Sequence, residues 1–136
     1  MKLDSATKGK IAEHFMYSLL LKNGLKVCVV LVDNEGMDCV ILGKKTYYPI
    51  QIKSRVEFEG NTITVYDFYE NMFIIAVNII TKEFWVIPKD VYQRLSRKKH
   101  HKKGYFYYRL NIKTKRKQLE KYKGNKGLKL LRKIVK

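Results

Sequence analysis

The sequence predicts one α/β domain, and three observations lead to this prediction. A chain of 136 residues is long enough for a single domain that buries its own hydrophobic core. An N-terminal segment with helical periodicity is followed by several short runs rich in Val, Ile and Tyr, a composition typical of strands. The 46% of hydrophobic residues and the lack of any low-complexity segment indicate that the chain folds.

The first predicted element is an amphipathic helix within residues 9–24. Ser5 or Thr7 can cap its start, and Asn23 and Gly24 are expected to end it. Its apolar positions recur at helical spacing and comprise Ile11, Ala12, Phe15, Met16, Leu19 and Leu20. This stripe predicts a helix face that packs against the rest of the domain.

The next three apolar runs, at residues 25–32, 37–43 and 47–54, are predicted to be consecutive strands. Short polar turns separate them, so a meander is the simplest arrangement. Residues 72–80 are apolar enough to form a central strand that is covered on both faces. A further strand is predicted at residues 83–88.

The remaining segments are more polar. Residues 55–71 form a polar excursion between two strands. Pro88 is predicted at the first turn of a helix over residues 88–98, where its missing N–H costs no hydrogen bond. A late strand is predicted at residues 105–112, and a basic terminal helix at residues 125–136.

The net charge of +17 is concentrated in the last third of the chain. Residues 1–93 carry eleven basic and eleven acidic side chains, whereas residues 94–136 carry eighteen basic side chains and a single acidic one, Glu120. Lysines and arginines that displace counterions from phosphates gain affinity for polyanions, so nucleic acid is the expected partner. A solvated lysine-rich surface is the alternative, although Glu does not rise together with Lys here.

Four polar side chains interrupt the apolar segments. Gln51 and Lys53 are two positions apart in the third strand, so they project from one face while Ile52 faces the other. Asp38 stands within the second strand, where a carboxylate buried alone is costly, and Glu13 borders the apolar face of the first helix. If the four groups converge, a divalent cation with the lysine beside it explains them best, because Mg²⁺ prefers oxygen ligands.

Each of these side chains also has an ordinary explanation. Glu13 could be a surface residue paired with Lys10 or Lys22, and Asp38 could belong to the turn of a hairpin. The two polar residues of the third strand could face solvent from the edge of a sheet. The aromatic residues at 105–108 could pack within the fold or stack on bases.

The order of the four polar residues resembles the motif of the PD-(D/E)XK nuclease superfamily. There, a Glu on the first helix precedes an Asp on the second strand and an (Asp/Glu/Gln)-x-Lys sequence on the third. The helix start "TKGKIAEHF", the strand "QIKS" and the later "FWVIPKDV" are similar to segments of archaeal Holliday junction resolvases and intron homing endonucleases. The resemblance covers roughly residues 5 to 92. It implies a restriction-endonuclease-like αβββαβ core, in which helices flank a central mixed sheet.

The resemblance also implies a role for each residue of the motif. Asp38, Gln51 and the carbonyl oxygen of Ile52 would bind Mg²⁺ or Mn²⁺, and Glu13 would bind the metal directly or through water. Lys53 would position the attacking water and stabilise the negative charge that develops on the phosphate. Most members carry Asp or Glu in place of Gln51, and an uncharged amide is expected to bind the metal less tightly.

The implied function is that of a metal-dependent endonuclease that hydrolyses phosphodiester bonds in DNA. The catalytic core would be the charge-neutral residues 1–93 of a single domain, and residues 94–136 would be its basic C-terminal part. Two alternatives are a resolvase of branched DNA and a non-catalytic nucleic-acid-binding protein that keeps the nuclease fold. The residues expected to contact nucleic acid are Lys8, Lys10, Arg55, Lys98, Lys99, Lys102, Lys103, Arg109, Lys115, Arg116 and Lys117.

Assembly and location can be predicted in outline. Cutting two strands at fixed positions favours a symmetric assembly, so a homodimer or higher homo-oligomer is expected. No apolar run approaches the ~18 residues of a membrane span, and the N-terminus lacks the apolar core of a signal peptide. A cytoplasmic protein without membrane contact is therefore expected.

Overall fold

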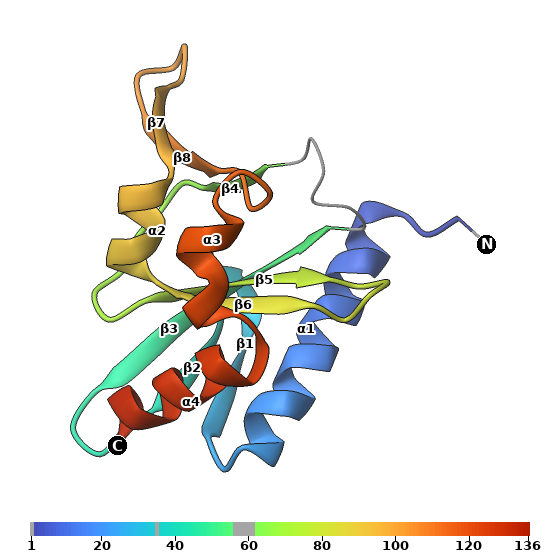
Figure 1. The fold of residues 1–136 in the computed structure, drawn as a ribbon, viewed down its shortest axis with the longest axis vertical. Helices are drawn as coiled ribbons and strands as arrows, with labels where there is room; N and C mark the ends of the chain where they lie inside the picture. The colour runs from blue at the N-terminus through green and yellow to red at the C-terminus, as the bar shows by residue number, and fades with distance from the viewer. Residues whose placement is uncertain (1, 35, 56–61) are drawn as a thin grey trace.

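The computed structural model describes residues 2–34, 36–55 and 62–136 of the chain. Its helices and strands form a mixed α/β fold, shown in Figure 1. The elements in order are α1 (Ser5–Lys22), β1 (Lys26–Asn34), β2 (Met37–Leu42), β3 (Tyr47–Arg55), β4 (Ile63–Val65), β5 (Phe73–Asn78), β6 (Phe84–Pro88), α2 (Lys89–Leu95), β7 (Arg97–His100), β8 (Phe106–Leu110), α3 (Arg116–Leu119), the 3₁₀ helix η1 (Glu120–Tyr122) and α4 (Gly124–Val135). None of the helices within the described ranges is long and apolar enough to cross a membrane.

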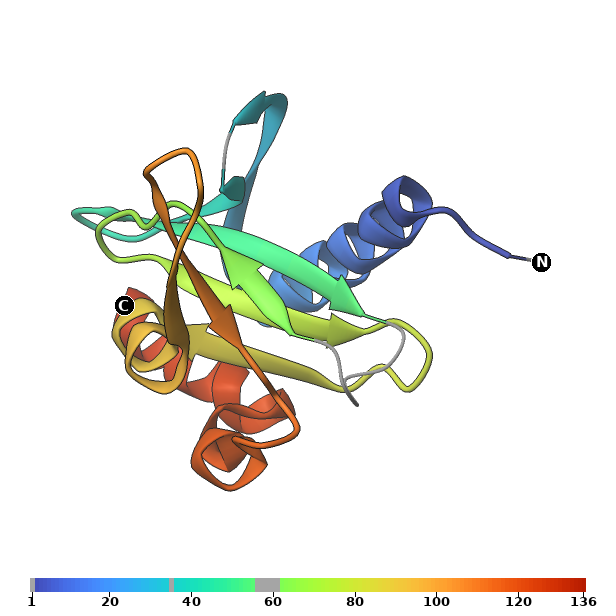
Figure 2. The same ribbon diagram turned by 90° about the horizontal axis from the view of Figure 1, so that it is seen from above.

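The central sheet has five strands in the order β1-β2-β3-β5-β6. β1, β2 and β3 form an antiparallel meander, as the sequence predicts, and Cys39 of β2 pairs with Ile50 of β3. β3 pairs with β5 in parallel, and β5 pairs with β6 in the antiparallel sense. β3 is therefore an interior strand, so Gln51 and Lys53 do not project from the edge of the sheet. Figure 2 shows β1 and β2 rising away from the other strands at one end.

Both faces of the central sheet are covered. One face packs against α1 and α4 in a core that includes Leu20 of α1 and Ile52 of β3. The other face packs against β4, β8, α2 and the segment between β8 and α4 in a second core. Because side chains alternate along a strand, Gln51 and Lys53 lie on this second face, opposite to Ile52.

A second sheet of three strands, in the order β4-β8-β7, lies over the second face. Its β7–β8 hairpin extends away from the central sheet (Figure 1). The sequence predicts neither β4 nor β7, because β4 has only three residues and β7, with the sequence RKKH, shows no apolar alternation. The helix predicted over 88–98 ends at Leu95, since Arg97–His100 pair with β8 instead.

Tyr92 of α2 joins the second sheet to the body of the domain. Its ring is fully buried, and its hydroxyl lies 2.6 Å from the backbone oxygen of Ile63 in β4 and 3.0 Å from that of Tyr108 in β8. Both carbonyl groups belong to strands that pair with each other. The Tyr92 hydroxyl therefore links α2 to both β4 and β8.

The mixed α/β class, with helices flanking a central mixed sheet, is confirmed. The order of elements differs in one respect from the αβββαβ order that the resemblance implies. The chain passes from β3 to the parallel β5 by way of β4, and residues 62–72 contain no helix. The helix α2 follows β6 instead, where Pro88 precedes its first residue.

The predicted first helix is confirmed, but with a different N-cap. α1 begins at Ser5, and Oδ1 of Asp4 accepts a hydrogen bond of 2.7 Å from the backbone N–H of Thr7. An aspartate satisfies the free N–H groups of a helix start at least as well as the hydroxyl of Ser5 or Thr7 would. The helix ends at Lys22, and Gly24 follows with a φ of 78°, as expected for a helix stop.

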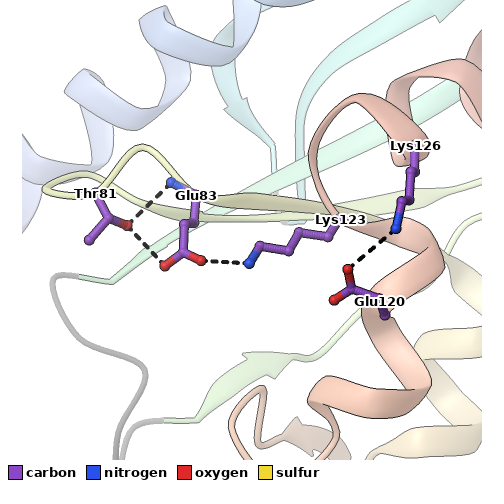
Figure 3. A network of polar contacts seen from close by, with 5 residues as sticks. All are labelled: Thr81, Glu83, Glu120, Lys123 and Lys126. Carbon is purple, nitrogen blue, oxygen red and sulfur yellow. Dashed lines mark hydrogen bonds and ion pairs between the residues drawn. The ribbon is translucent and has the colours of Figure 1, made fainter.

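One ion pair links the basic C-terminal part to the loop before β6, and a second ion pair lies within the C-terminal part (Figure 3). Nζ of Lys123 lies 2.7 Å from Oε2 of Glu83, next to β6, and Nζ of Lys126 lies 3.3 Å from Oε1 of Glu120. The hydroxyl of Thr81 holds the other oxygen of Glu83 at 3.3 Å. Side chains of α4 also complete the first core. Residues after 94 therefore contribute to packing as well as to charge.

Candidate active site

Asp38 and Ile52 meet where β2 and β3 stop pairing. The last paired residues at this end of the two strands are Cys39 and Ile50. Just beyond them, Oδ2 of Asp38 accepts a hydrogen bond of 2.7 Å from the backbone N–H of Ile52. The N–H and C=O groups of a strand residue point to the same side of the strand. The carbonyl oxygen of Ile52 therefore faces the same edge of β3 as the Asp38 carboxylate.

The helix α1 brings Glu13 and Tyr17 to this place. They are four residues apart and so lie on the same side of the helix. The Tyr17 hydroxyl is 3.3 Å from Oε1 of Glu13 and 3.3 Å from the backbone oxygen of Asp38, so it can donate to either. Oε2 of Glu13 lies 3.6 Å from Nζ of Lys10. Glu13 thus has the surface ion pair considered above, and Tyr17 also ties it to β2.

The environment of Asp38 resists ionisation of its carboxyl group. Burial raises the pKa of Asp38 above the ordinary value of 3.8, and the negative charge of Glu13 raises it further. The hydrogen bond from Ile52 and the charges of Lys53 and Lys10 lower it and only partly compensate. An additional positive charge near Asp38 would therefore stabilise its ionised form.

Lys53 shows the corresponding effect for a base. Burial lowers the pKa of its ammonium group below the ordinary value of 10.5, and the charge of Arg55 lowers it further, while the Asp38 carboxylate raises it. Asp38 accepts its hydrogen bond from the backbone N–H of Ile52, the residue before Lys53. A lysine with a lowered pKa releases its proton more readily than a surface lysine does.

Gln51 and Lys53 line a cleft between the central sheet and the second sheet. The cleft has a volume of about 550 Å³. Its other lining residues are Gly36, Tyr66, Asp67, Tyr105 and Phe106. Oε1 of Gln51 is buried and has no hydrogen-bond partner within the part of the chain that the structure describes. A buried amide oxygen without a partner is costly, and it marks a place where an ion or ligand can supply the missing contact.

The turn between β1 and β2 contributes Gly36 to the cleft. Gly36 has a φ of 81°, a conformation that other residues rarely adopt. A Cβ atom at this position would lie 3.5 Å from both Cβ and the backbone oxygen of Asp67, an ordinary van der Waals distance, so the turn lies against the segment that follows β4. The positive φ, and not a lack of space, therefore favours glycine here.

The oxygen atoms around Asp38 suit a hard divalent cation. The Tyr17 hydroxyl lies 3.3 Å from both Oε1 of Glu13 and the backbone oxygen of Asp38, so these two residues are neighbours, and the carbonyl of Ile52 faces the same edge. Gln51 lies in the cleft with Lys53, whereas Asp38 and Glu13 are not among the residues that line it. Within the described ranges, Oε1 of Gln51 has no hydrogen-bond partner. No group of three or more His, Cys, Asp and Glu residues that could hold a metal is found within residues 2–34, 36–55 and 62–136. The predicted ligand set has only two such residues, and Mg²⁺ accepts amide and carbonyl oxygens as further ligands.

The predicted nucleic-acid contacts lie on three elements, with one exception. The β7–β8 hairpin carries Lys98, Lys99, Lys102, Lys103 and Arg109, the region of α3 carries Lys115, Arg116 and Lys117, and α1 carries Lys8 and Lys10. Arg55 is the exception, because its guanidinium group is partly buried and engaged within the chain. It donates to the backbone oxygen of Thr62 at 3.1 and 2.8 Å, and to that of Ser54 at 2.6 Å.

Two residues of the site, Tyr17 and Tyr66, are not predicted from the sequence. Tyr17 has a usable signal, because it follows Glu13 at the spacing of one helical turn. Tyr66 has none, since it lies in a polar segment far along the chain from the residues it meets. Only the pairing of β4 with β8 brings it to Tyr105 and Phe106, whose role the sequence leaves open between packing and stacking.

Comparison with solved structures finds this fold in two nucleases. The bacterial homing endonuclease I-Ssp6803I matches with a TM-score of 0.53 and 25% sequence identity, over 66% of this chain and 69% of that one. Hjc, a Holliday junction resolvase from the archaeal hyperthermophile Archaeoglobus fulgidus, matches with a TM-score of 0.50 and 12% identity, over 74% of this chain and 88% of that one. No family model and no curated protein sequence matches the chain.

Both matched proteins have PD-(D/E)XK-like nuclease folds, and this chain has the same fold. The resemblance that its sequence shows to that superfamily is therefore confirmed at the level of structure. The likeness to the resolvase, at 12% identity, concerns the fold alone. The match to the homing endonuclease, at 25% identity, supports a nuclease function.

Proposed function

We propose that this chain is a metal-dependent endonuclease that hydrolyses phosphodiester bonds in DNA. The observation that carries the proposal is the position of Lys53. Its side chain lines the cleft beside Gln51, and the carboxylate of Asp38 is bound to the backbone N–H of the preceding residue, Ile52. A carboxylate and a lysine held together at a cleft can orient a water molecule and stabilise the charge that develops on a phosphate. The likeness in fold to two nucleases supports the same function.

Mg²⁺ or Mn²⁺ fits the donor atoms of this site. Asp38, Glu13, the carbonyl oxygen of Ile52 and Oε1 of Gln51 would hold it, because all four supply oxygen and the amide oxygen has no partner among the residues that the structure describes. When bound, the metal would supply Lewis acidity and positive charge at the reacting phosphate. With an amide in place of a third carboxylate, the affinity of the site for the metal should be modest.

The residues of the chain would each perform a distinct task. The N–H of Ile52 fixes the orientation of the Asp38 carboxylate, and the Tyr17 hydroxyl keeps Glu13 beside it. Lys53 would hold the attacking water and place a positive charge next to the phosphate in the cleft. Because burial lowers the pKa of Lys53, its Nζ can also exchange a proton during the reaction.

The basic surface would bind the DNA backbone. The lysines and arginines of the β7–β8 hairpin and of α3 can each neutralise a phosphate, which makes binding strong at low salt and weak at high salt. A homodimer would supply two sites for the two strands of a duplex. On β1, the side chains of Val29 and Leu31 are 48% and 95% exposed, and such apolar exposure suits contact with a second copy.

A plasmid-nicking assay tests the proposal. Supercoiled DNA should be converted to nicked and linear forms with Mg²⁺ or Mn²⁺, and should stay intact with EDTA. Asp38→Asn and Lys53→Met should abolish the conversion, whereas Asp90→Asn and Lys22→Met, which change exposed residues outside the site, should not. Equal nicking by the wild type and both site variants, or nicking in EDTA, would refute the proposal.

A second candidate function is the resolution of branched DNA, which the likeness in fold to the Hjc resolvase favours. A third is nucleic-acid binding without catalysis, which the uncharged Gln51 favours because it weakens a metal site. A synthetic four-way junction and a linear duplex of the same sequence separate the first two, since a resolvase should cut the junction at least tenfold faster. Tight binding of both DNAs without cutting, in Mg²⁺ or in Mn²⁺, would favour the third.

A further inference from the structure

The cleft has two chemically different walls. The wall on β3 carries the polar Gln51 and Lys53, and the wall on the second sheet carries Tyr66 and Tyr105, here called the aromatic wall. Phe106 also lines the cleft, but its ring lies with Lys98 and Tyr108 on the opposite face of the β7–β8 hairpin from Tyr105. Tyr66 is 52% exposed and Tyr105 42%, so each ring presents much of its surface to solvent. Large aromatic side chains left this exposed around a cleft mark a surface for binding.

The two rings of the aromatic wall contact other rings. His101 stacks on Tyr105 with centroids 4.3 Å apart and an interplanar angle of 10°. The ring centroids of Tyr66 and Tyr105 are 6.0 Å apart, with the rings inclined by 62°, and those of Tyr66 and Tyr107 are 5.8 Å apart. These contacts restrict the rings before any ligand binds, which lowers the entropy lost on binding.

The two walls together define the chemistry of a ligand. It must have a flat apolar face for the rings and a negative group for Lys53, and it must fit about 550 Å³, within the range of clefts for small ligands. A single nucleotide satisfies all three conditions. A base inside a duplex is already stacked between its neighbours, so it can reach the aromatic wall only when it is unpaired or turned out of the helix.

We propose that the cleft accepts one unpaired nucleotide of a DNA strand, with its base against the aromatic wall and its phosphate next to Lys53. The inference rests on the proposed function, because it takes the nucleotide to be part of the substrate. It adds the class of substrate: DNA with an unpaired nucleotide at the site of cleavage, such as a bulge, a gap or a flap. Base stacking on aromatic rings tolerates every base, so the selection is for structure rather than for sequence.

A fluorescent base tests this directly. A duplex with one bulged 2-aminopurine is mixed with the full-length protein in EDTA, so that no cleavage occurs, and a fully paired duplex with the same base serves as the comparison. Stacking on the aromatic wall should quench the fluorescence of the bulged base, and the wild type should bind the bulged duplex about 5- to 100-fold more tightly than the paired one.

Variants of the wall make the test specific. Tyr105→Ala and Tyr66→Ala should each reduce the quenching and the preference for bulged DNA, while binding of the paired duplex changes less than about two-fold. Tyr105→Phe keeps a ring and should behave as the wild type. Tyr47→Ala removes a tyrosine that is 56% exposed but lies outside the cleft, and it should have no effect. Thermal unfolding of each variant confirms that it is folded.

The outcomes separate this inference from the proposed function. If cleavage depends on metal but the bulged base is not quenched, or both alanine variants retain the preference, the inference is overturned and the nuclease function stands. If quenching requires the aromatic wall but no DNA is cut with Mg²⁺ or Mn²⁺, the nucleotide site stands and the nuclease function is overturned. Faster cutting of bulged than of paired DNA, lost on Tyr105→Ala, supports both.

Discussion

The carboxylate of Asp38 and the backbone N–H of Ile52 are joined by a hydrogen bond of 2.7 Å at the point where β2 and β3 separate. Through this bond one strand orients an acidic side chain with the backbone of its neighbour, and the side chains on either side of Ile52 face the cleft. The alternation of side chains along β3 places Gln51 and Lys53 on the cleft side, and the packing of α1 on the same sheet places Glu13 near Asp38. The pairing of β2 with β3 and the packing of α1 therefore determine where the candidate site lies.

The buried charges at this site should reduce the stability of the fold at neutral pH. Burial raises the pKa of Asp38, so the folded state binds its proton more tightly than the unfolded state does. Such a group adds stability below pH 3.8, and this contribution is lost as the pH rises through its folded pKa. Asp38→Asn should therefore unfold at a higher temperature than the wild type at pH 7, and the difference should shrink as the pH falls towards 4.

Circular dichroism melts between pH 4 and pH 8 check this expectation, with Asp90→Asn as a control for the loss of an exposed carboxylate. The amide oxygen of an asparagine can still accept the hydrogen bond from Ile52, so the backbone contact need not be lost. If Asp38→Asn melts below the wild type at pH 7, or if its melting temperature differs from that of the wild type by the same amount at every pH, then ionised Asp38 does not destabilise the folded state.

Tyr92→Phe should lower the free energy of unfolding by about 1–3 kcal/mol, because it removes a buried donor and leaves the carbonyls of Ile63 and Tyr108 without it. Chemical denaturation measures this loss. Tyr47→Phe, which alters a hydroxyl on the surface, is the matched control and should stay within about 0.5 kcal/mol of the wild type. Equal stability of the two variants would mean that water replaces the Tyr92 hydroxyl at no cost.

The sequence predicts the central sheet well because its strands bury apolar side chains with a regular pattern. The four polar residues of the motif stand out for the same reason, since each breaks a pattern. β7 cannot be predicted from an apolar pattern, because Arg97–His100 contain no apolar residue. Their strand conformation depends on pairing with β8. Arg55 shows a second limit, because its charge indicates a phosphate contact, whereas the backbone oxygens that it binds are visible only in the structure.

The cleft itself could not be predicted from sequence. It forms between two sheets, and its aromatic wall joins Tyr66, after β4, to Tyr105, just before β8. No spacing in the chain links these residues, and their proximity follows from the register in which Val65 pairs with Tyr108. Features that arise between separate elements depend on tertiary packing, which local periodicity does not describe.

The tip of the β7–β8 hairpin should contribute to the salt dependence of DNA binding. Changing Lys102 and Lys103 together to Gln removes up to two phosphate contacts, and each contact contributes about 0.9 to the slope of log K against log salt. The slope should therefore fall by about 1–2 units, and affinity should fall for every sequence alike. Lys44 and Lys45, two exposed lysines in the turn between β2 and β3, provide a control pair with the same change in charge.

Fluorescence anisotropy with one labelled duplex at several salt concentrations measures both slopes. The control pair lies in a different turn and on a different sheet, so its removal should alter the slope only through the total charge of the protein. An identical decrease in the two double variants would indicate that binding responds to net charge and not to the hairpin.

Gln51→Glu should tighten the binding of Mg²⁺ by about tenfold, because it restores a charged ligand where the structure has an unpaired amide oxygen. Without metal the same change buries an unpaired carboxylate and should lower the melting temperature. Added Mg²⁺ should then stabilise the variant more than it stabilises the wild type. Calorimetric titration and melts with and without metal check both parts, and unchanged metal affinity would show that Gln51 does not face the metal.

Lys53→Met and Asp38→Asn should each reduce the rate of DNA cleavage by about 10²–10⁴, the loss typical of a group that positions or transfers a proton. DNA binding should stay within a few-fold, since one contact among many phosphate contacts is a small loss. The reductions should not multiply in the double variant, because the two groups act on the same event: without Asp38 to help hold the metal, Lys53 has no step to assist. A double variant whose rate falls by the product of the two single effects would show that Asp38 and Lys53 act independently, and a wild-type rate for Lys53→Met would remove this lysine from the mechanism.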